Sequence, residues 1–397
     1  MGKYNFDKWI ERTGTSCVKY DFAKESGYSG EELSLWVADM DFETVPEITE
    51  ALVERVKHGI YGYTMPKEDY WDTVISYMEK EHNYKTNQEW YLNAPGIVFA
   101  LSMAIRALTN EGDSVIIQRP VYHPFTRMVE ANNRKLINSS LKEVMIDGSI
   151  HYEMDLKDFE EKIQLHNVKL FILCNPHNPV GRVWTRDELI AIGEICRKYG
   201  VVVVSDEIHF DFVYPGFKHT CFASISKEFE DMTITCTSPT KTFNLAGLQI
   251  SNVIIENKEI REKVIEEIKS TGYDEPNIFG MIACKAAYEF GKPWLEELNE
   301  YLLGNLNFVR EFLKQHLPKI SLIEPEGTYL IWLDFREYQL TKEELEQRIV
   351  NDAKLRLNVG RMFGEEGEGF ERVNIATPRA YLEKAMKQLE QAFVDLR

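Results

Sequence analysis

Apolar runs alternate with helical segments through the middle of the chain. Residues 169–174 and 201–205 form two such runs, and their continuous apolar character is typical of strands buried on both faces of a parallel sheet. A helix at 186–199 lies between them and ends at Gly200. This strand–helix–strand rhythm predicts an α/β fold with a large, doubly wound and mostly parallel sheet.

The two ends of the chain do not continue this alternation of strands and helices. Residues 1–45 are irregular and rich in aromatic side chains, which predicts an arm that packs on a larger body. The last hundred or so residues combine a long helix, a strand and two later helices expected over 341–355 and 380–396. We therefore expect the arm to join a small α+β domain at 290–397, with a large domain at 46–289.

The charge balance is acidic, with 64 aspartate and glutamate residues against 46 lysine and arginine residues. The resulting net charge of −18 argues against nucleic acids and anionic membranes as partners. The first residues carry no apolar signal core, and no apolar run reaches the length of a membrane span. A cytoplasmic protein that binds neither nucleic acid nor membrane is expected.

The cysteines and histidines show neither a disulfide pattern nor a metal-binding pattern. Six cysteines are scattered without a Cys-x-x-Cys motif, and the nine histidines show no spacing such as His-Glu-x-x-His. We therefore expect neither a disulfide framework nor a metal site.

Side chains that can bind or react follow the ends of four predicted strands, near positions 118, 174, 205 and 237. They are Tyr122, Asn178, Asp206 with His209, and Ser238 with Lys241. If the strands are parallel, all four groups meet at one edge of the sheet, where α/β proteins place their ligands. The meeting of all four groups at one edge indicates a ligand-binding site more strongly than any one group does alone.

The residue types fit the chemistry of pyridoxal phosphate. The amine of Lys241 can form a Schiff base with the cofactor's aldehyde. A buried carboxylate at Asp206 would keep the ring nitrogen protonated through charge pairing. Asn178, with His209, could hydrogen-bond the phenolic oxygen, and Tyr122 could stack on the ring.

The phosphate of such a cofactor needs N–H groups and hydroxyls. A helix start at Gly96, Ile97 and Val98 offers free N–H groups behind a glycine, and Ser238 offers a hydroxyl. Each residue also has an ordinary structural interpretation: Asp206 could cap a helix, for example, and Tyr122 could belong to the core.

Several stretches give the chain a family resemblance. Asn178–Gly181, Ser205–His209 and Ser238–Asn244 resemble the motifs of fold-type I pyridoxal-phosphate enzymes of the aminotransferase class I/II superfamily. Within it, Trp36–Phe42 and Lys241–Leu248 resemble the cystathionine β-lyase branch, the C–S lyases of MalY/PatB type.

The resemblance implies roles for residues that patterns alone do not reveal. Lys241 would hold the cofactor and move the proton, and Arg372 would bind the α-carboxylate of the substrate. Tyr63 would reach the phosphate of a neighbouring subunit, which implies a homodimer with shared active sites. The segments at Trp36 and Tyr61 of the two subunits would line the substrate pocket.

The chain departs from the family pattern at three places. Gln249 stands where many aminotransferases carry a phosphate-binding arginine, and the helix start at 96–98 lacks the usual hydroxyls. His209 stands where many relatives carry a tyrosine that serves the phenolic oxygen. The phosphate would therefore depend on backbone N–H groups, Ser238 and Tyr63.

The resemblance implies a lyase that cleaves S-conjugates of L-cysteine such as cystathionine. The products would be a thiol (homocysteine from cystathionine), pyruvate and ammonia. An aminotransferase is the main alternative, because both reactions begin with loss of the Cα proton. A regulatory protein that binds a transcription factor is a second alternative, although the presence of Lys241, Asp206 and Arg372 argues against a purely regulatory role.

Overall fold

The computed structural model describes residues 2–146 and 148–396. Its larger sheet has seven strands, in the order β2 (Tyr91–Ala94), β10 (Ser251–Ile254), β9 (Thr233–Thr237), β8 (Val202–Asp206), β7 (Leu170–Cys174), β3 (Ser114–Ile117) and β4 (Lys135–Asn138). Every neighbouring pair from β9 to β4 is parallel, and β10 runs against both of its neighbours. The prediction of a mostly parallel sheet is confirmed.

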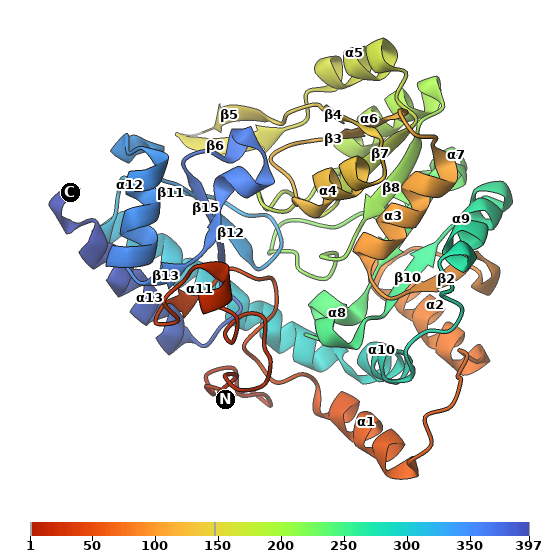
Figure 1. Cartoon of the computed structure of the whole chain (residues 1–397), viewed down its shortest axis with the longest axis horizontal. Coiled ribbons are helices and arrows are strands. Elements are labelled where there is room, and N and C mark those ends of the chain that lie inside the picture. Colours follow the sequence, from red (N-terminus) through yellow and green to blue (C-terminus); the bar gives the residue numbers. More distant parts are fainter. Residues whose placement is uncertain (1, 147, 397) are drawn as a thin grey trace.

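Alternate residues of the central strands pack on opposite sides of this sheet. Leu170 and Ile172 of β7 belong to a core shared with α3 (Ile97–Leu108), α4 (Pro124–Ala131) and α9 (Lys258–Ser270). Phe171 and Leu173 belong to a second core shared with α5 (Leu156–His166) and α6 (Arg186–Tyr199). Helices therefore cover both faces (Figure 1), which explains why these strands are apolar without alternation.

A second sheet lies at the other side of the molecule (Figure 1). It is antiparallel, in the order β11 (Ser321–Ile323), β12 (Leu330–Asp334), β15 (Phe370–Asn374) and β14 (Asn358–Val359). The arm joins this part of the chain, because β1 (Leu33–Ser34) pairs in parallel with β13 (Leu355–Arg356). The long helix α11 (Lys292–His316) and α13 (Arg379–Ala392) pack beside it. The exact boundaries at 45/46 and 289/290 stay a prediction.

Further elements complete the fold: α1 (Pro46–His58), α2 (Glu68–His82), α7 (Lys227–Asp231), α8 (Pro239–Thr242), α10 (Ile278–Phe290), α12 (Lys342–Glu346) and the hairpin β5 (Lys142–Ile146) with β6 (Ser149–Glu153). The helix expected over 341–355 is shorter than predicted. A π-helical segment at Gln347–Asp352 follows α12, and Leu355 already belongs to β13. The last helix ends at Ala392 and is followed by a 3-10 turn.

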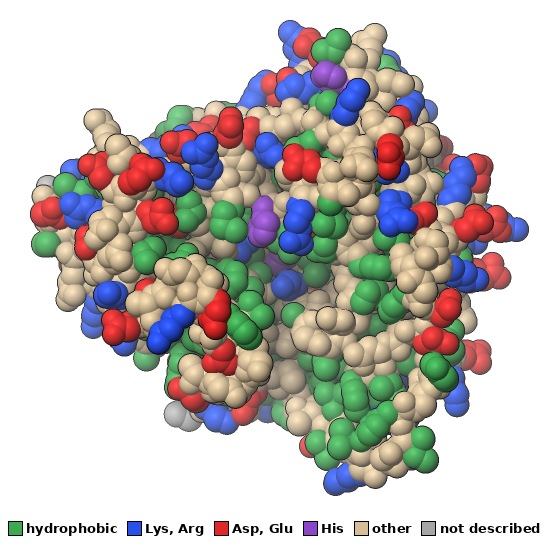
Figure 2. Space-filling model, viewed as in Figure 1, with side chains coloured by type: hydrophobic (Ala, Val, Ile, Leu, Met, Phe, Trp, Pro, Cys, Tyr) green, Lys and Arg blue, Asp and Glu red, His purple; other side chains and the backbone are tan. Residues whose placement is uncertain are grey.

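Apolar side chains gather on the surface over α1 and the chain that follows it (Figure 2). They are Val53, Val56, Ile60, Tyr61, Tyr63 and Met65, each more than two-fifths exposed. Among residues 2–146 and 148–396, no helix is long and apolar enough to cross a lipid bilayer.

Candidate active site

A cavity of about 180 Å³ opens where β7, β8 and β9 end. Eight of the residues singled out from the sequence line it: Gly96, Ile97, Val98, Tyr122, Asn178, Asp206, His209 and Lys241. They meet there because the parallel strands place their carboxyl ends side by side.

Lys241 lies in α8, a short helix that begins directly after β9 and is capped by Ser238. Its Nζ donates a 2.6 Å hydrogen bond to the carbonyl of Ala38. Ala38 belongs to residues 36–42, which we call the arm loop. Burial, together with the positive charge of Arg372, lowers the pKa of Lys241 to about 8, although the carboxylates of Asp39 and Asp206 oppose this.

The lowered pKa predicts how readily the apoprotein takes up pyridoxal phosphate. Only a neutral amine attacks an aldehyde, so we expect the rate of attachment to Lys241 to rise with pH, with a midpoint near 8. The measurement is the growth of visible absorbance after mixing apoprotein and cofactor from about pH 6 to pH 10. Borohydride trapping and peptide mass spectrometry would locate the bond, and a midpoint near that of ordinary lysine would contradict the prediction.

Asp206 is a buried carboxylate at the end of β8. Its Oδ1 accepts a 3.2 Å hydrogen bond from the N–H of Ile208, and no basic side chain within the described part of the chain forms an ion pair with it. Burial raises the pKa of Asp206 to about 7, with a smaller contribution from Glu207. A protonated ring nitrogen would supply the missing positive charge, so this residue fits the cofactor.

Arg372 lies in the middle of β15 and is a buried cation with no ion-pair partner among residues 2–146 and 148–396. Its guanidinium donates to Asn178 Oδ1 (2.9 Å), the carbonyl of Trp36 (2.9 Å) and Asn358 Oδ1 (2.5 Å), and its Nε has no partner within the described residues. Burial lowers the pKa of Arg372 to about 10. A carboxylate of a substrate would satisfy this guanidinium, in line with the role expected for it.

Two aromatic residues border the cavity between these charged groups. The N–H of Tyr122 donates to the carbonyl of Asn178 (3.1 Å), which fixes the position of the tyrosine relative to the end of β7. His209 is neutral, because burial and the nearby charges of Lys241 and Arg372 lower the pKa of His209 to about 3. Its Nδ1 has no hydrogen-bond partner within the described residues, so it can serve a ligand.

The residues predicted to bind the phosphate differ from the lining of the cavity in one respect. Gly96 caps α3 without a side-chain hydrogen bond, which leaves the first N–H groups of the helix available. Ser238 is not among the lining residues: its hydroxyl donates to the carbonyl of Ile250 (2.7 Å) and accepts from the N–H of Thr240 (3.1 Å). Thr240 and Ser251 line the cavity instead, and sequence reasoning missed both.

Four other predicted residues are not among the residues that line this cavity: Tyr63, predicted for the phosphate, and Tyr61, Trp36 and Arg372, predicted for the substrate. Tyr63 is 96% exposed and Tyr61 is 55% exposed, so neither contributes to the site of its own chain. Trp36 contributes its carbonyl to Arg372, whereas its indole ring packs against Arg356, whose Cζ lies 4.2 Å from the ring centroid.

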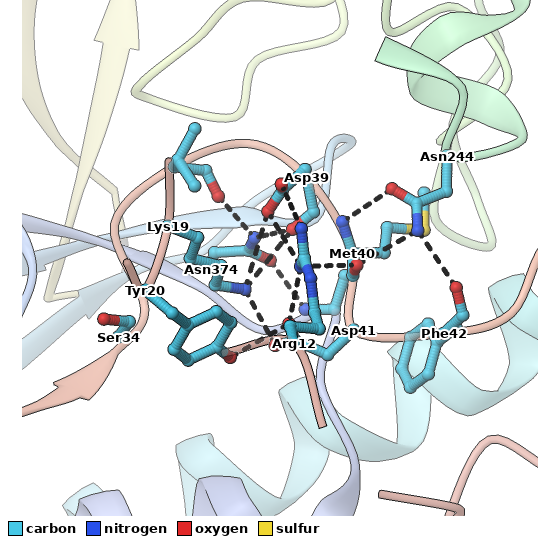
Figure 3. Close-up of polar contacts among 12 residues, drawn as sticks. Arg12, Lys19, Tyr20, Ser34, Asp39, Met40, Asp41, Phe42, Asn244 and Asn374 are labelled. Carbon is cyan, nitrogen blue, oxygen red and sulfur yellow. Dashed lines mark hydrogen bonds and ion pairs between the residues drawn. The ribbon is translucent and has the colours of Figure 1, made fainter. Parts of the chain in front are cut away.

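The arm loop is held from both sides (Figure 3). From the segment after α8, Asn244 donates to the carbonyls of Met40 and Phe42 (3.0 Å each) and accepts from the N–H of Met40 (3.0 Å). From β15, Asn374 donates to the carbonyl of Asp39 (2.7 Å). These contacts place the loop between Lys241 on one side and the small sheet on the other.

Buried charges tie the same loop to the arm (Figure 3). Lys19 Nζ lies 2.7 Å from Asp41 Oδ2, with both side chains fully buried, and Arg12 Nη1 lies 2.8 Å from Asp41 Oδ1. Burial alone would raise the pKa of Asp41, but the two cations outweigh it and hold the pKa below its ordinary value. Removing one partner of such a buried pair typically costs about 3–5 kcal/mol, so the loop is firmly placed.

Three potential metal ligands come together away from this cavity. The ligand atoms of His82, His219 and Cys221 lie within 4.8 Å of one another, which spacing along the sequence did not reveal. His82 Nε2 already contacts Asp211 Oδ1 (2.9 Å), and His219 Nε2 contacts Glu207 Oε2 (3.1 Å). These hydrogen bonds give the cluster a structural role, and the expected absence of a metal stays a prediction.

Comparisons with known proteins identify the family. The aminotransferase class I and II family model matches residues 31–389. The chain is 46% identical over 388 residues to cystathionine beta-lyase PatB of Bacillus subtilis (strain 168), which covers 98% of this chain and 99% of that protein.

Two solved structures show the same fold with the cofactor bound. Cystalysin from Treponema denticola, which contains pyridoxal 5'-phosphate, superposes with a TM-score of 0.95 at 37% identity over 99% of this chain and 100% of that one. The PLP-bound C-S lyase from Staphylococcus hominis gives 0.91 at 34% identity over 98% of each chain. The resemblance to C–S lyases is thereby confirmed, and the chain belongs to the pyridoxal-phosphate-dependent aminotransferase class I and II family.

Proposed function

We propose that this protein is a pyridoxal-phosphate-dependent β-lyase that cleaves the C–S bond of L-cysteine S-conjugates, with cystathionine as a substrate. Water then converts the three-carbon fragment to pyruvate and ammonia, and the sulfur leaves as homocysteine. The observation that carries the proposal is an intact site: Lys241 and Asp206 line one cavity, and Arg372 donates to Asn178 of its lining, in a chain 46% identical to a cystathionine β-lyase.

Each residue has a task in this reaction. Pyridoxal phosphate supplies an electron sink for Cα of the substrate when it is bound. Arg372 binds the α-carboxylate and orients the substrate, and the amine of Lys241 takes the proton from Cα. The electrons then expel the thiolate from Cβ. Asp206 keeps the ring nitrogen protonated, and Asn178 with His209 serves the phenolic oxygen.

The test is a coupled assay on the holoenzyme with L-cystathionine, following pyruvate and free thiol together. Equal amounts of both products are expected, because one elimination releases one of each. A holoenzyme that contains the full complement of cofactor and releases neither product would overturn the proposal.

The competing functions make different predictions. An aminotransferase would convert a keto acid acceptor without releasing thiol, and that outcome would favour it. A regulatory protein would bind a transcription factor without turnover.

We also propose a cytoplasmic location and no nucleic-acid partner, supported by six free cysteines and the acidic net charge of −18.

We further propose that the active enzyme is a homodimer in which Tyr63 completes the partner's site. Tyr63 is 96% exposed beside the apolar surface over α1, a combination expected of a contact between subunits. Its hydroxyl would then bind the phosphate, where this chain carries Gln249 and no hydroxyl at 96–98.

Co-expression of two inactive variants tests the shared site. A mixed dimer of Lys241→Ala and Tyr63→Ala chains has one site with both residues intact, because the tyrosine comes from the other subunit. We expect about a quarter of the wild-type activity, since half of the dimers are mixed and each has one working site. If activity is not recovered while mixed dimers form, Tyr63 acts within its own chain, and if Tyr63→Ala alone is as active as wild type, Tyr63 has no role in the site.

A further inference from the structure

A second hollow of about 460 Å³ lies beside the cofactor cavity. Arginines, glutamates and a histidine line it, namely Arg119, His123, Arg127, Glu130, Arg361 and Glu365. We call it the arginine groove. Figure 2 shows a histidine and basic side chains gathered beside a hollow near the centre of the face drawn there.

The arginine groove adjoins the cofactor cavity at Tyr122 and His123. Tyr122 lines the cavity, and the next residue, His123, lines the groove, with 5.5 Å between the ring centroids. Phe363 stands between the groove and Arg372: its ring centroid lies 6.2 Å from that of His123 and 4.9 Å from Arg372 Cζ. Arg372 and His123 therefore contact the same ring, which puts the groove next to the guanidinium that would bind the α-carboxylate.

The charges of the groove are not neutralised by the protein. Within the described residues, the guanidinium groups of Arg127 and Arg361 make no ion pair or hydrogen bond. Arg119 makes one side-chain hydrogen bond, to the hydroxyl of Thr126 (2.9 Å). Three guanidinium groups around one hollow are notable in a chain with a net charge of −18, and they attract a carboxylate.

Glu130 and Glu365 add the opposite charge to the same groove. Neither carboxylate forms an ion pair with the three arginines in the described part of the chain. A ligand with both a carboxylate and an ammonium group would satisfy both kinds of side chain. An alkyl chain would satisfy neither, because it would leave the guanidinium groups without an anion.

We infer that the arginine groove binds the leaving-group half of the substrate when that half is itself an amino acid. The inference rests on the proposed β-lyase function and adds the substrate class to it. The carboxylate of the departing thiol lies on Arg127 and Arg361, and its ammonium group lies by Glu130 or Glu365. The enzyme would therefore prefer cystathionine to S-alkyl cysteines.

Two substrates and four proteins test the inference. The substrates are L-cystathionine and S-ethyl-L-cysteine, which share the reacting half and differ in the leaving group. The proteins are wild type, Arg127→Gln, the double variant Arg127→Gln with Arg361→Gln, and Arg197→Gln as a control at an exposed arginine of α6 that pairs with Glu194. The two arginines that are replaced, Arg127 and Arg361, are exposed, so their replacement should leave the fold intact.

We expect kcat/KM for cystathionine to fall about tenfold or more in the double variant, mainly through KM. The value for S-ethyl-L-cysteine should change by less than about twofold, and Arg197→Gln should change neither. Equal losses for both substrates, or no loss for either, would overturn the inference.

A binding measurement separates failure of the groove from failure of the proposed reaction. If wild type releases no pyruvate from either substrate, the β-lyase proposal fails. Titration of the holoenzyme's visible absorbance then gives a dissociation constant for each compound without turnover. A selective loss of affinity for cystathionine in the double variant would still support the groove, and equal affinities across all proteins would overturn it.

Discussion

Replacing Lys241 with alanine is expected to slow pyruvate release from cystathionine by about 10³-fold or more. The variant loses the amine that holds the cofactor and the base that takes the Cα proton, so two steps fail together. The measurement is the coupled pyruvate assay, with cofactor content determined separately for each preparation. The cavity should persist, because Asp206, Asn178 and the helix start at 96–98 are unchanged.

Controls distinguish this loss from a general defect. Lys198 is an exposed lysine of α6, and Lys198→Ala should retain wild-type activity. A small primary amine added to Lys241→Ala should restore part of the rate, since it can take the proton in place of the side chain. Activity of Lys241→Ala within a few-fold of wild type would rule out the role assigned to this residue.

Asp206→Asn is expected to lower kcat by about 10²-fold or more, because an amide cannot hold a proton on the ring nitrogen. The same change should stabilise the apoprotein at high pH. Burial raises the pKa of Asp206 to about 7, whereas an unfolded aspartate titrates near ~3.9. Wild-type stability therefore falls as pH rises from about 4 to 7, and it stays lowered above 7.

Melting temperatures of the two apoproteins test this linkage. The variant should melt above wild type at about pH 8, and the difference should shrink as the pH falls toward about 4, where both forms of the site are neutral. A difference that does not depend on pH would show that the carboxylate is not buried and unpaired in the apoprotein. A variant with full activity would show that ring protonation does not depend on Asp206.

The residues at the strand ends were predictable, because a parallel sheet brings the carboxyl ends of its strands to one edge. Asp206 ends β8, and Asn178 and Lys241 follow β7 and β9, so a parallel register alone brings them to one edge. Arg372 is different: it lies within β15 with no local pattern, and only the family resemblance pointed to it.

Other contacts of the site cannot be predicted from residue types. The carbonyl of Ala38 accepts from Lys241 through its backbone, which any residue could provide. Thr240 was overlooked in favour of Ser238, because the direction of a hydroxyl depends on the geometry of a four-residue helix. The roles proposed for Tyr61 and Tyr63 would require a second subunit, so the structure of one chain does not test them.

The contact between Arg372 and the arm loop has a consequence for how the enzyme is made. It joins residues 336 positions apart, so the loop leaves the ribosome long before the strand that carries Arg372. During synthesis the sheet that carries Lys241 and Asp206 can form before β15 exists. A nascent chain can thus build its cofactor cavity before it can bind a substrate, and catalytic competence arises only after β15 has been synthesised.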